Sequence, residues 1–138
     1  MRNPIGRLAR EAALALCLYS PPTVALAHHS FAVFFSSEKE LVTLKGTVKE
    51  YHFTNPHGII EVIVTTPSGA QEDWKIETNS PSILSRRGWS KTSIASGEVI
   101  SVQGWPARDG SKYMRLRAAF RADGAPIGMP PDGNLSRP

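Results

Sequence analysis

Histidine is the residue type in this chain whose number and spacing could do chemistry. The four histidines, His28, His29, His52 and His57, fall within a stretch of thirty residues. Imidazole nitrogens bind late transition metals such as copper. The single cysteine, Cys17, excludes an intramolecular disulfide and any zinc site that needs two thiolates. Metal binding through nitrogen is therefore the chemistry that the composition favours.

The residues before His28 have the pattern of an export signal. Three arginines precede an apolar run from Ala12 to Tyr19, and the small residues Ala25 and Ala27 stand where a signal peptidase needs them. The run is interrupted by prolines and is too short to span a bilayer as a stable helix. We expect residues 1–27 to be a signal peptide cut after Ala27. The mature protein would then be periplasmic or secreted, with no transmembrane segment.

Two other interpretations of this segment are an uncleaved membrane anchor and a lipid-modified Cys17. Leu16 stands directly before Cys17, where lipidation requires a small residue. Cleavage after Ala27 would remove the cysteine altogether, so the mature chain would contain no thiol.

Cleavage would also change the charge balance. The 138-residue chain has 16 basic and 12 acidic residues, a net charge of +4. Without the three arginines and Glu11 of the first 27 residues, 13 basic and 11 acidic residues remain, a net charge of +2. A nearly neutral exported domain is a poor binder of polyanions. We therefore expect no nucleic-acid partner.

A cut after Ala27 would make His28 the first residue of the mature chain. Its α-amine and imidazole can chelate one metal ion, and a third nitrogen from a distant histidine completes the T-shaped histidine brace that suits Cu(II). His57 follows a proline in a loop and is the freest candidate for that nitrogen. His29 and His52 are the remaining candidates. These residues predict a small exported binding module for copper or a related metal.

The histidines also allow other interpretations. A cut after Leu26 would expose a copper-binding terminus with histidine third, although leucine is a poor residue before the cut. Without metal, His28 and His29 would stay solvated, and His57 would cap its loop by bonding to the backbone. His52 lies between two aromatic residues expected to point inward, so its own side chain should point outward.

The segment Arg86-Arg87-Gly88-Trp89 is a second candidate site. Two arginines beside a tryptophan can form a pocket for a carboxylate or another anion. This would make the protein a metal-free module that binds an envelope protein or an envelope anion. In the favoured alternative, the segment ends a helix and Trp89 plugs one end of the fold.

The remaining charged residues give little support for catalysis. Serines and histidines are present, but no Gly-x-Ser-x-Gly elbow, phosphate loop or paired acid and base stands out. An oxidase using a histidine-brace copper is a weak further possibility. Five basic residues around the last hairpin resemble a nucleic-acid platform, but a solvated sheet face is the favoured interpretation. They are Arg108, Lys112, Arg115, Arg117 and Arg121.

Alternating apolar and polar residues predict five strands that position these groups. The first strand needs a bulge near Lys49 and Glu50, because its apolar residues change from even to odd positions there. On the last strand, Met114, Leu116, Ala118 and Phe120 are expected to share one face. The expected strands cover residues 42–53, 59–66, 71–78, 97–105 and 113–121.

One short helix is expected between the third and fourth strands. Ser80 is a plausible N-cap, Pro81 suits the first helical position, and Gly88 suits the C-terminal turn. Three strands, a helix and two strands follow the plan of the OB-fold, a small five-stranded barrel. We expect an all-β, OB-like barrel over residues 28–121 and a flexible Gly- and Pro-rich tail over residues 122–138. The competing architecture, a small β-sandwich, usually needs about seven strands.

Several motifs together resemble a family of small exported bacterial proteins known only as a domain of unknown function. The similarity covers roughly His28 to Phe120. It implies export and one compact β domain, but no activity, cofactor or catalytic residue. The motifs are His28-His29-Ser30-Phe31, Thr54-Asn55-Pro56-His57, Asn79-Ser80-Pro81 with Arg86-Arg87-Gly88-Trp89, and Gly104-Trp105-Pro106-Ala107-Arg108-Asp109-Gly110.

Overall fold

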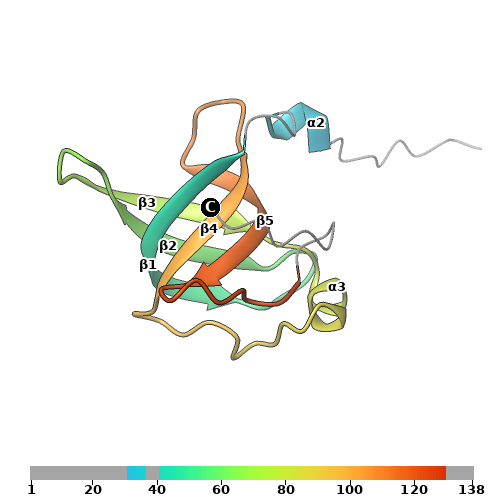
Figure 1. The fold of residues 1–138 in the computed structure, drawn as a ribbon. Coiled ribbons are helices and arrows are strands. Elements are labelled where there is room, and N and C mark those ends of the chain that lie inside the picture. Colours follow the sequence, from blue (N-terminus) through green and yellow to red (C-terminus); the bar gives the residue numbers. More distant parts are fainter. Residues whose placement is uncertain (1–30, 37–40, 130–138) are drawn as a thin grey trace, which may run out of the picture.

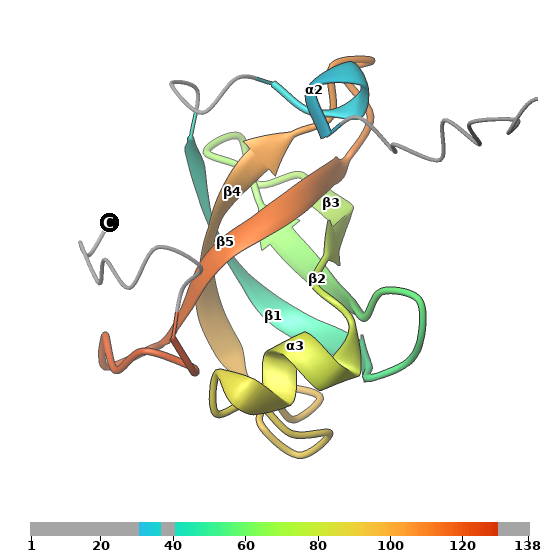
Figure 2. The same ribbon diagram turned by 90° about the vertical axis from the view of Figure 1, so that its right-hand side faces the viewer.

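The computed structural model describes residues 31–36 and 41–129. The expected signal peptide, His28 and His29 lie outside these residues. Five strands form a closed barrel in the order β1-β2-β3-β5-β4, with the short helices α2 and α3 at opposite ends (Figures 1 and 2). The elements are α2 (Phe31–Phe34), β1 (Val42–His52), β2 (Ile59–Thr65), β3 (Gln71–Glu77), α3 (Pro81–Arg86), β4 (Val99–Pro106) and β5 (Tyr113–Arg121).

The barrel closes through one parallel and four antiparallel strand pairs. Strand β1 pairs with both β2 and β4, and β3 and β5 pair in parallel. With α3 between β3 and β4, this arrangement confirms the predicted OB-like barrel. In the described part of the chain, no helix is long and apolar enough to cross a membrane. The helix α2 was not anticipated from the sequence.

The predicted irregularity in β1 is present. The register with β2 shifts between Val48 and Glu50. Val48 is buried before the shift, and Tyr51 and Phe53 pack against the core after it. A bulge therefore keeps apolar side chains on the inner face of a long, bent strand.

The prediction for the inner face of β5 was partly wrong. Met114 and Leu116 belong to the core cluster as expected, but the next member is Ala119. Gln103 of β4 pairs with Ala118 and Gly104 with Leu116, so Arg117 is the extra residue of a bulge. The bulge reverses the alternation, which places Ala118 and Phe120 outside the core cluster although both are buried.

The chain continues to pack against the barrel after residue 121. The Ile127 amide donates to the Ala119 carbonyl at 2.8 Å, and the Ile127 side chain is only 5% exposed. Phe120 forms a β-bridge with Pro126. The packed domain therefore extends at least to Ile127, past the boundary expected at residue 121. The rest of the expected tail lies outside the described residues.

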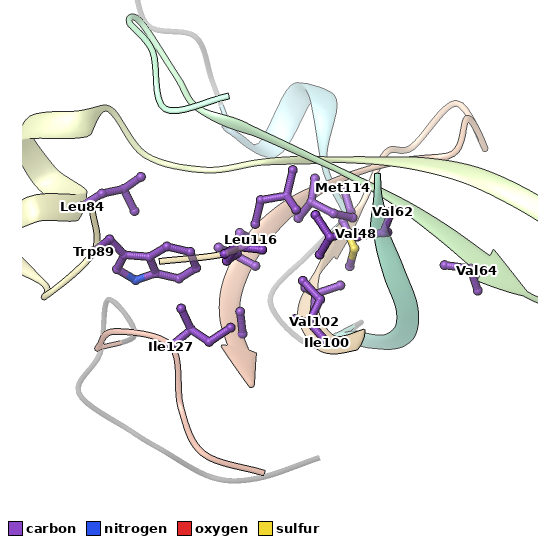
Figure 3. Packing of buried hydrophobic residues seen from close by; sticks show 14 residues of the cluster. Val48, Val62, Val64, Leu84, Trp89, Ile100, Val102, Met114, Leu116 and Ile127 are labelled. Atoms are coloured by element: carbon purple, nitrogen blue, oxygen red, sulfur yellow. The ribbon is translucent and has the colours of Figure 1, made fainter. Parts of the chain in front are cut away.

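Trp89 closes the barrel end beside α3. Its side chain lies between Leu84 and Ile127 (Figure 3) and is 5% exposed. A Cβ at Gly128 would lie 2.1 Å from the Trp89 ring, so only glycine allows this close contact. The plug interpretation of Trp89 is confirmed.

Ser80 occupies the N-cap position of α3, but its side chain makes no capping hydrogen bond.

Candidate functional site

An open groove of about 920 Å³ lies along the outside of the barrel. Its walls come from four parts of the chain: the segment around α2, the loop between β1 and β2, the outer face of β3, and the hairpin that leads from β4 into β5. Phenylalanines of the α2 segment form one apolar wall. The groove therefore combines an aromatic wall with titratable side chains.

The carboxylate of Glu77 is the centre of a hydrogen-bonded network in this groove. Its Oε1 atom lies 2.8 Å from Nδ1 of His57 and 2.5 Å from Nη1 of Arg115. Its Oε2 atom accepts a hydrogen bond of 2.6 Å from the hydroxyl of Tyr113. The Glu77 side chain is 16% exposed. We call Glu77, His57, Tyr113 and Arg115 the Glu77 network.

Arg115 is held from several directions. Its Nη1 atom also donates to the Thr78 carbonyl at 2.8 Å, and its Nη2 atom donates to Oδ1 of Asn79 at 2.5 Å. These contacts fix the plane of the guanidinium, so it holds Glu77 in one orientation. The charge of Arg115 is balanced by Glu77.

The parallel pairing of β3 and β5 builds this network. Glu77 is in register with Arg115, and Lys75 with Tyr113. Side chains at paired positions on one face lie close together. Residues more than thirty positions apart in the sequence are thereby brought into contact.

Gly58 brings the loop that carries His57 against the end of β3. Its amide donates to the Asn79 carbonyl at 3.3 Å, and its carbonyl accepts from the Thr78 amide at 2.8 Å. A Cβ at this position would lie 2.6 Å from Oγ1 of Thr78 and 2.8 Å from the His52 carbonyl oxygen. The lack of a side chain allows this approach, and His57 is held beside Glu77.

The contact with Glu77 determines which nitrogen of His57 is free. A carboxylate only accepts hydrogen bonds, so Nδ1 of His57 carries a proton, and in the neutral imidazole Nε2 is the nitrogen that has the lone pair. The His57 side chain is 44% exposed and lines the groove. Histidines that bind metals commonly donate their second nitrogen to a carboxylate in this way. In the neutral imidazole, this arrangement presents Nε2 to a ligand.

Tyr113 remains protonated within the network. Burial raises the pKa of its hydroxyl above the ordinary value, and the bond to Glu77 and the charge of Glu77 raise it further. The hydroxyl is therefore a donor to Glu77 at neutral pH.

The two predicted histidines that the structure describes, His52 and His57, lie in different places. His57 lies in the groove, whereas His52 is absent from its lining, and Nε2 of His52 lies 3.4 Å from Oε2 of Glu50. His28 and His29 lie outside the described residues. Within residues 31–36 and 41–129, no group of three or more His, Cys, Asp or Glu could hold a metal ion. His57 therefore has no such group around it in the described part of the chain.

The second candidate site lacks an exposed aromatic group. Trp89 is buried and contacts Tyr51 edge to face, with ring centroids 6.2 Å apart. Arg86 is exposed, and the carbonyl of the half-buried Arg87 accepts from the Met129 amide at 2.9 Å. The structure does not place Trp89 at the surface beside the two arginines.

The basic residues around the last hairpin are largely neutralised. Lys112 bonds to Glu72 at 2.6 Å, and this bond is the main reason why the pKa of Glu72 is lowered. Arg121 pairs with Glu98. The predicted solvated position of Arg117 was wrong, because it is 9% exposed and its guanidinium bonds to Gln103. Three of the five basic residues, Lys112, Arg115 and Arg121, therefore pair with carboxylates.

Glu77, Tyr113 and Arg115 were not predicted from the sequence to be site residues. Each was assigned only to a strand or to a charged face. The predicted topology contained a usable signal, because an OB-like barrel places its third and fifth strands side by side. Pairing the outward residues of those two strands would have brought Glu77 close to Arg115.

Comparison with family models matches the chain to a family of unknown function (DUF6152) over residues 15–115. The match covers most of the chain, and the chain belongs to this family. It confirms the resemblance expected from the motifs and includes the whole Glu77 network. No curated protein matches the chain.

Proposed function

We propose that this family member is a small exported metal-binding module that holds Cu(II) in the groove. The ligands are the α-amine and imidazole of His28 and Nε2 of His57. His29 is an alternative ligand from the same terminus. The observation that carries the proposal is the 2.8 Å contact between Nδ1 of His57 and Glu77. In the neutral imidazole, this contact leaves Nε2 of His57 as an oriented nitrogen donor.

The position of the α2 segment supports a shared site. Phe31 lines the same groove as His57. His28 precedes Phe31 by three residues, so a fully extended chain places it at most about 11 Å away. A terminus tethered at this distance can bring its amine and imidazole to the mouth of the groove.

The donor set favours copper over other divalent ions. Nitrogen donors bind Cu(II) more tightly than the other divalent first-row metals, and three nitrogens suit its T-shaped coordination. The three proposed ligands are neutral, so they do not compensate the charge of the metal. Glu77 supplies a negative charge behind His57, through its contact with Nδ1 of that histidine.

Export is part of this proposal because cleavage after Ala27 creates the amine ligand. In an uncleaved chain, the nitrogen of His28 is an amide and cannot chelate in the same way. The metal would therefore be bound in the periplasm or outside the cell.

Copper titration of the mature protein tests the proposal. The protein starts at His28, and a matched form carries three extra glycines before it, so that neither His28 nor His29 is the third residue. We expect the extra residues to lower Cu(II) affinity by at least about tenfold, because they remove the amine from the chelate. The His57→Ala variant should also bind more weakly and lose one nitrogen from the Cu(II) electron paramagnetic resonance spectrum.

The His52→Ala variant is the matched control, because His52 is comparably exposed but does not line the groove. Its affinity and spectrum should equal those of the unchanged protein. Equal affinity of the His28-terminated and glycine-extended forms would overturn the proposal.

A further inference from the structure

The groove has an aromatic wall in addition to its titratable residues. The side chains of Phe31 and Phe34 in α2 line it, and both are exposed. The next ring, that of Phe35, is buried and stacks on Tyr113 with centroids 6.1 Å apart. Phe31 also contacts Trp105 edge to face, with centroids 5.1 Å apart. The wall is therefore anchored to the barrel while two of its rings stay accessible to a ligand.

Hydrogen bonds of the backbone hold this wall against the β4–β5 hairpin. The Arg108 amide donates to the Phe34 carbonyl at 3.0 Å, and Nε of Arg108 donates to the Phe35 carbonyl at 2.7 Å. Phe35 also forms a β-bridge with Ala107. None of these contacts uses the ring of Phe34, so the ring can be removed without loss of a backbone bond.

Charged side chains of both signs form other parts of the lining. Asp73 and Lys75 lie exposed on the outer face of β3, and Asp109 and Lys112 lie on the hairpin between β4 and β5. Among the described lining residues, three carboxylates stand against three lysine and arginine side chains. Apart from His57, this lining is therefore neutral overall.

The charges disfavour a polyanionic ligand. Nucleic acids are held mainly by cations that contact their phosphates. Lys75 lies 3.3 Å from Glu61, and Lys112 lies 2.6 Å from Glu72, so both cations already have partners. The carboxylate of Asp109 also lines the groove and would repel a phosphate. A nucleic acid is therefore the alternative occupant that the test must exclude.

The lining also disfavours a lipid chain and an added peptide strand. A hydrocarbon chain would remove water from the charged side chains, which is costly. A peptide strand adds to a free backbone edge. Beside the groove, the end of β4 is already paired, because the Ser36 amide donates to the Pro106 carbonyl at 2.9 Å.

An uncharged sugar chain matches this combination of groups. A sugar ring has apolar C–H faces that can pack on an aromatic ring, and its hydroxyls both donate and accept hydrogen bonds. In the groove, the carboxylate of Asp109 is an acceptor and the ammonium of Lys75 is a donor. Oδ1 of Asp109 accepts from the Ser111 amide at 2.9 Å, which orients the carboxylate and leaves it further acceptor capacity. Because the groove is open, a chain of sugars can extend past its ends.

We propose that the groove is a binding site for an uncharged oligosaccharide. One sugar ring packs on Phe34, and its hydroxyl groups bond to Asp109 and Lys75. The site consists of described residues alone. It goes beyond the copper proposal and does not depend on it, because no contact with the sugar requires a metal or Nε2 of His57.

Titration with two uncharged tetrasaccharides tests the proposal. One is chitotetraose, built of N-acetylglucosamine, and the other is cellotetraose, which lacks the acetamido groups. The backbone amides of the isotope-labelled protein are followed by NMR in buffer containing a chelator, so that no copper contributes. We expect saturable shifts with at least one of the two sugars, in amides of α2, β3 and the β4–β5 hairpin.

The Phe34→Ala variant should lower the affinity for the sugar at least about tenfold, because an aromatic side chain that the ligand covers is lost. Val33→Ala is the matched control. Val33 is 63% exposed in the same helix, against 58% for Phe34, but it does not line the groove. Its affinity should equal that of the unchanged protein.

A second pair of variants tests the polar contacts. Lys75→Ala should lower the affinity about fivefold, because one hydrogen bond to the ligand is lost. Lys45 is an exposed lysine of β1 that does not line the groove, so Lys45→Ala should have no effect. The amide spectrum of each variant also establishes that it is folded.

Three results would overturn the proposal. The first is that neither sugar causes saturable shifts in the groove. The second is an equal loss of affinity in Phe34→Ala and Val33→Ala, which would show that any exposed apolar residue has this effect. The third is tighter binding of a single-stranded oligothymidylate than of either sugar, which would assign the groove to nucleic acid. The outcome of the copper titration is independent of all three, because the chelator removes the metal.

Discussion

The plugged end beside α3 and the groove beside α2 use aromatic residues for opposite purposes. At the plugged end, Trp89 is surrounded by Leu84 and Ile127, and Gly128 lies against its ring. In the groove, Tyr113 has one face against Phe35 and turns its hydroxyl toward Glu77. The plugged end excludes water, and the groove keeps its polar atoms accessible to water.

Within one small barrel, the residues of the plugged end contribute to stability, and those of the groove are available for chemistry. A domain of this size buries only around two thirds of its unfolded surface, so it depends on a complete apolar core. Polar groups at the plugged end would be costly, because a buried group without a partner loses its hydration. The groove holds its titratable residues on the outer face of the strands, where each can find a partner.

The largest expected effect comes from breaking the plug. We expect Trp89→Ala to lower the free energy of unfolding by about 3–5 kcal/mol, because it leaves a cavity between Leu84 and Ile127. Urea unfolding measures this change. The exposed neighbour Arg86, changed to alanine, should shift the free energy by less than about 0.5 kcal/mol. A loss below about 1 kcal/mol in Trp89→Ala would contradict the assignment of the plug as a core element.

Removing the charge of Glu77 should weaken both copper binding and stability. We expect Glu77→Gln to lower Cu(II) affinity by about 10- to 100-fold, because a carboxylate that orients a ligand histidine contributes this much. The free energy of unfolding should fall by about 2 kcal/mol, since charged hydrogen bonds are lost. Calorimetric titration and urea unfolding measure the two effects.

Glu61 provides a matched control for that substitution. It pairs with Lys75 at 3.3 Å outside the network, and its side chain is 23% exposed. Glu61→Gln should leave copper affinity unchanged. An equal loss of affinity in both variants would show that general charge, and not the contact with His57, is responsible.

The next comparison concerns two tyrosine hydroxyls. Tyr113 donates to Glu77, whereas the hydroxyl oxygen of Tyr51 is buried and has no hydrogen-bond partner among the described residues. We expect Tyr113→Phe to lower the free energy of unfolding by about 1 kcal/mol, and Tyr51→Phe to leave it unchanged or raise it slightly. Urea unfolding at neutral pH checks this. A larger loss in Tyr51→Phe would reverse the comparison.

Alkaline pH should reveal the smallest effect. Burial raises the pKa of Tyr113 above 10.0, its ordinary value, so the unfolded chain loses this proton first. The contribution of the Tyr113 proton to stability is therefore fully present below pH 10 and is lost as the pH rises above it. Between pH 9 and 10.5 we expect less than about 1 kcal/mol from Tyr113, because its partial exposure reduces the effect. Tyr113→Phe should show a flatter profile over this range.

The local features of the barrel were predictable from the sequence. The reversal of apolar positions around Lys49 indicated the bulge in β1, and the spacing of Ser80 and Gly88 indicated a short helix. The Trp89 plug followed from its place just after that helix. Each of these depends on residues a few positions apart, where periodicity and turn chemistry act.

The features that depend on distant residues were missed. The bulge at Arg117 requires the register between β4 and β5, and the contact of Arg115 with Glu77 requires the register between β3 and β5. Burial of Ile127 depends on an apolar surface that exists only after the barrel closes. A single sequence carries no direct signal for such registers. Of the candidate site, only His57 was identified from sequence among the described residues.

The parallel pairing of β3 and β5 also has a consequence in time. Glu77 and Arg115 are 38 positions apart, and they meet only when the last strand joins the third. Contacts of large sequence separation form slowly, because the intervening chain must first be ordered. We therefore expect the carboxylate behind His57 to arrive late in folding. If the proposed site binds Cu(II), a refolding chain would show the spectrum of that site only when the barrel closes, so the spectrum would report this folding step.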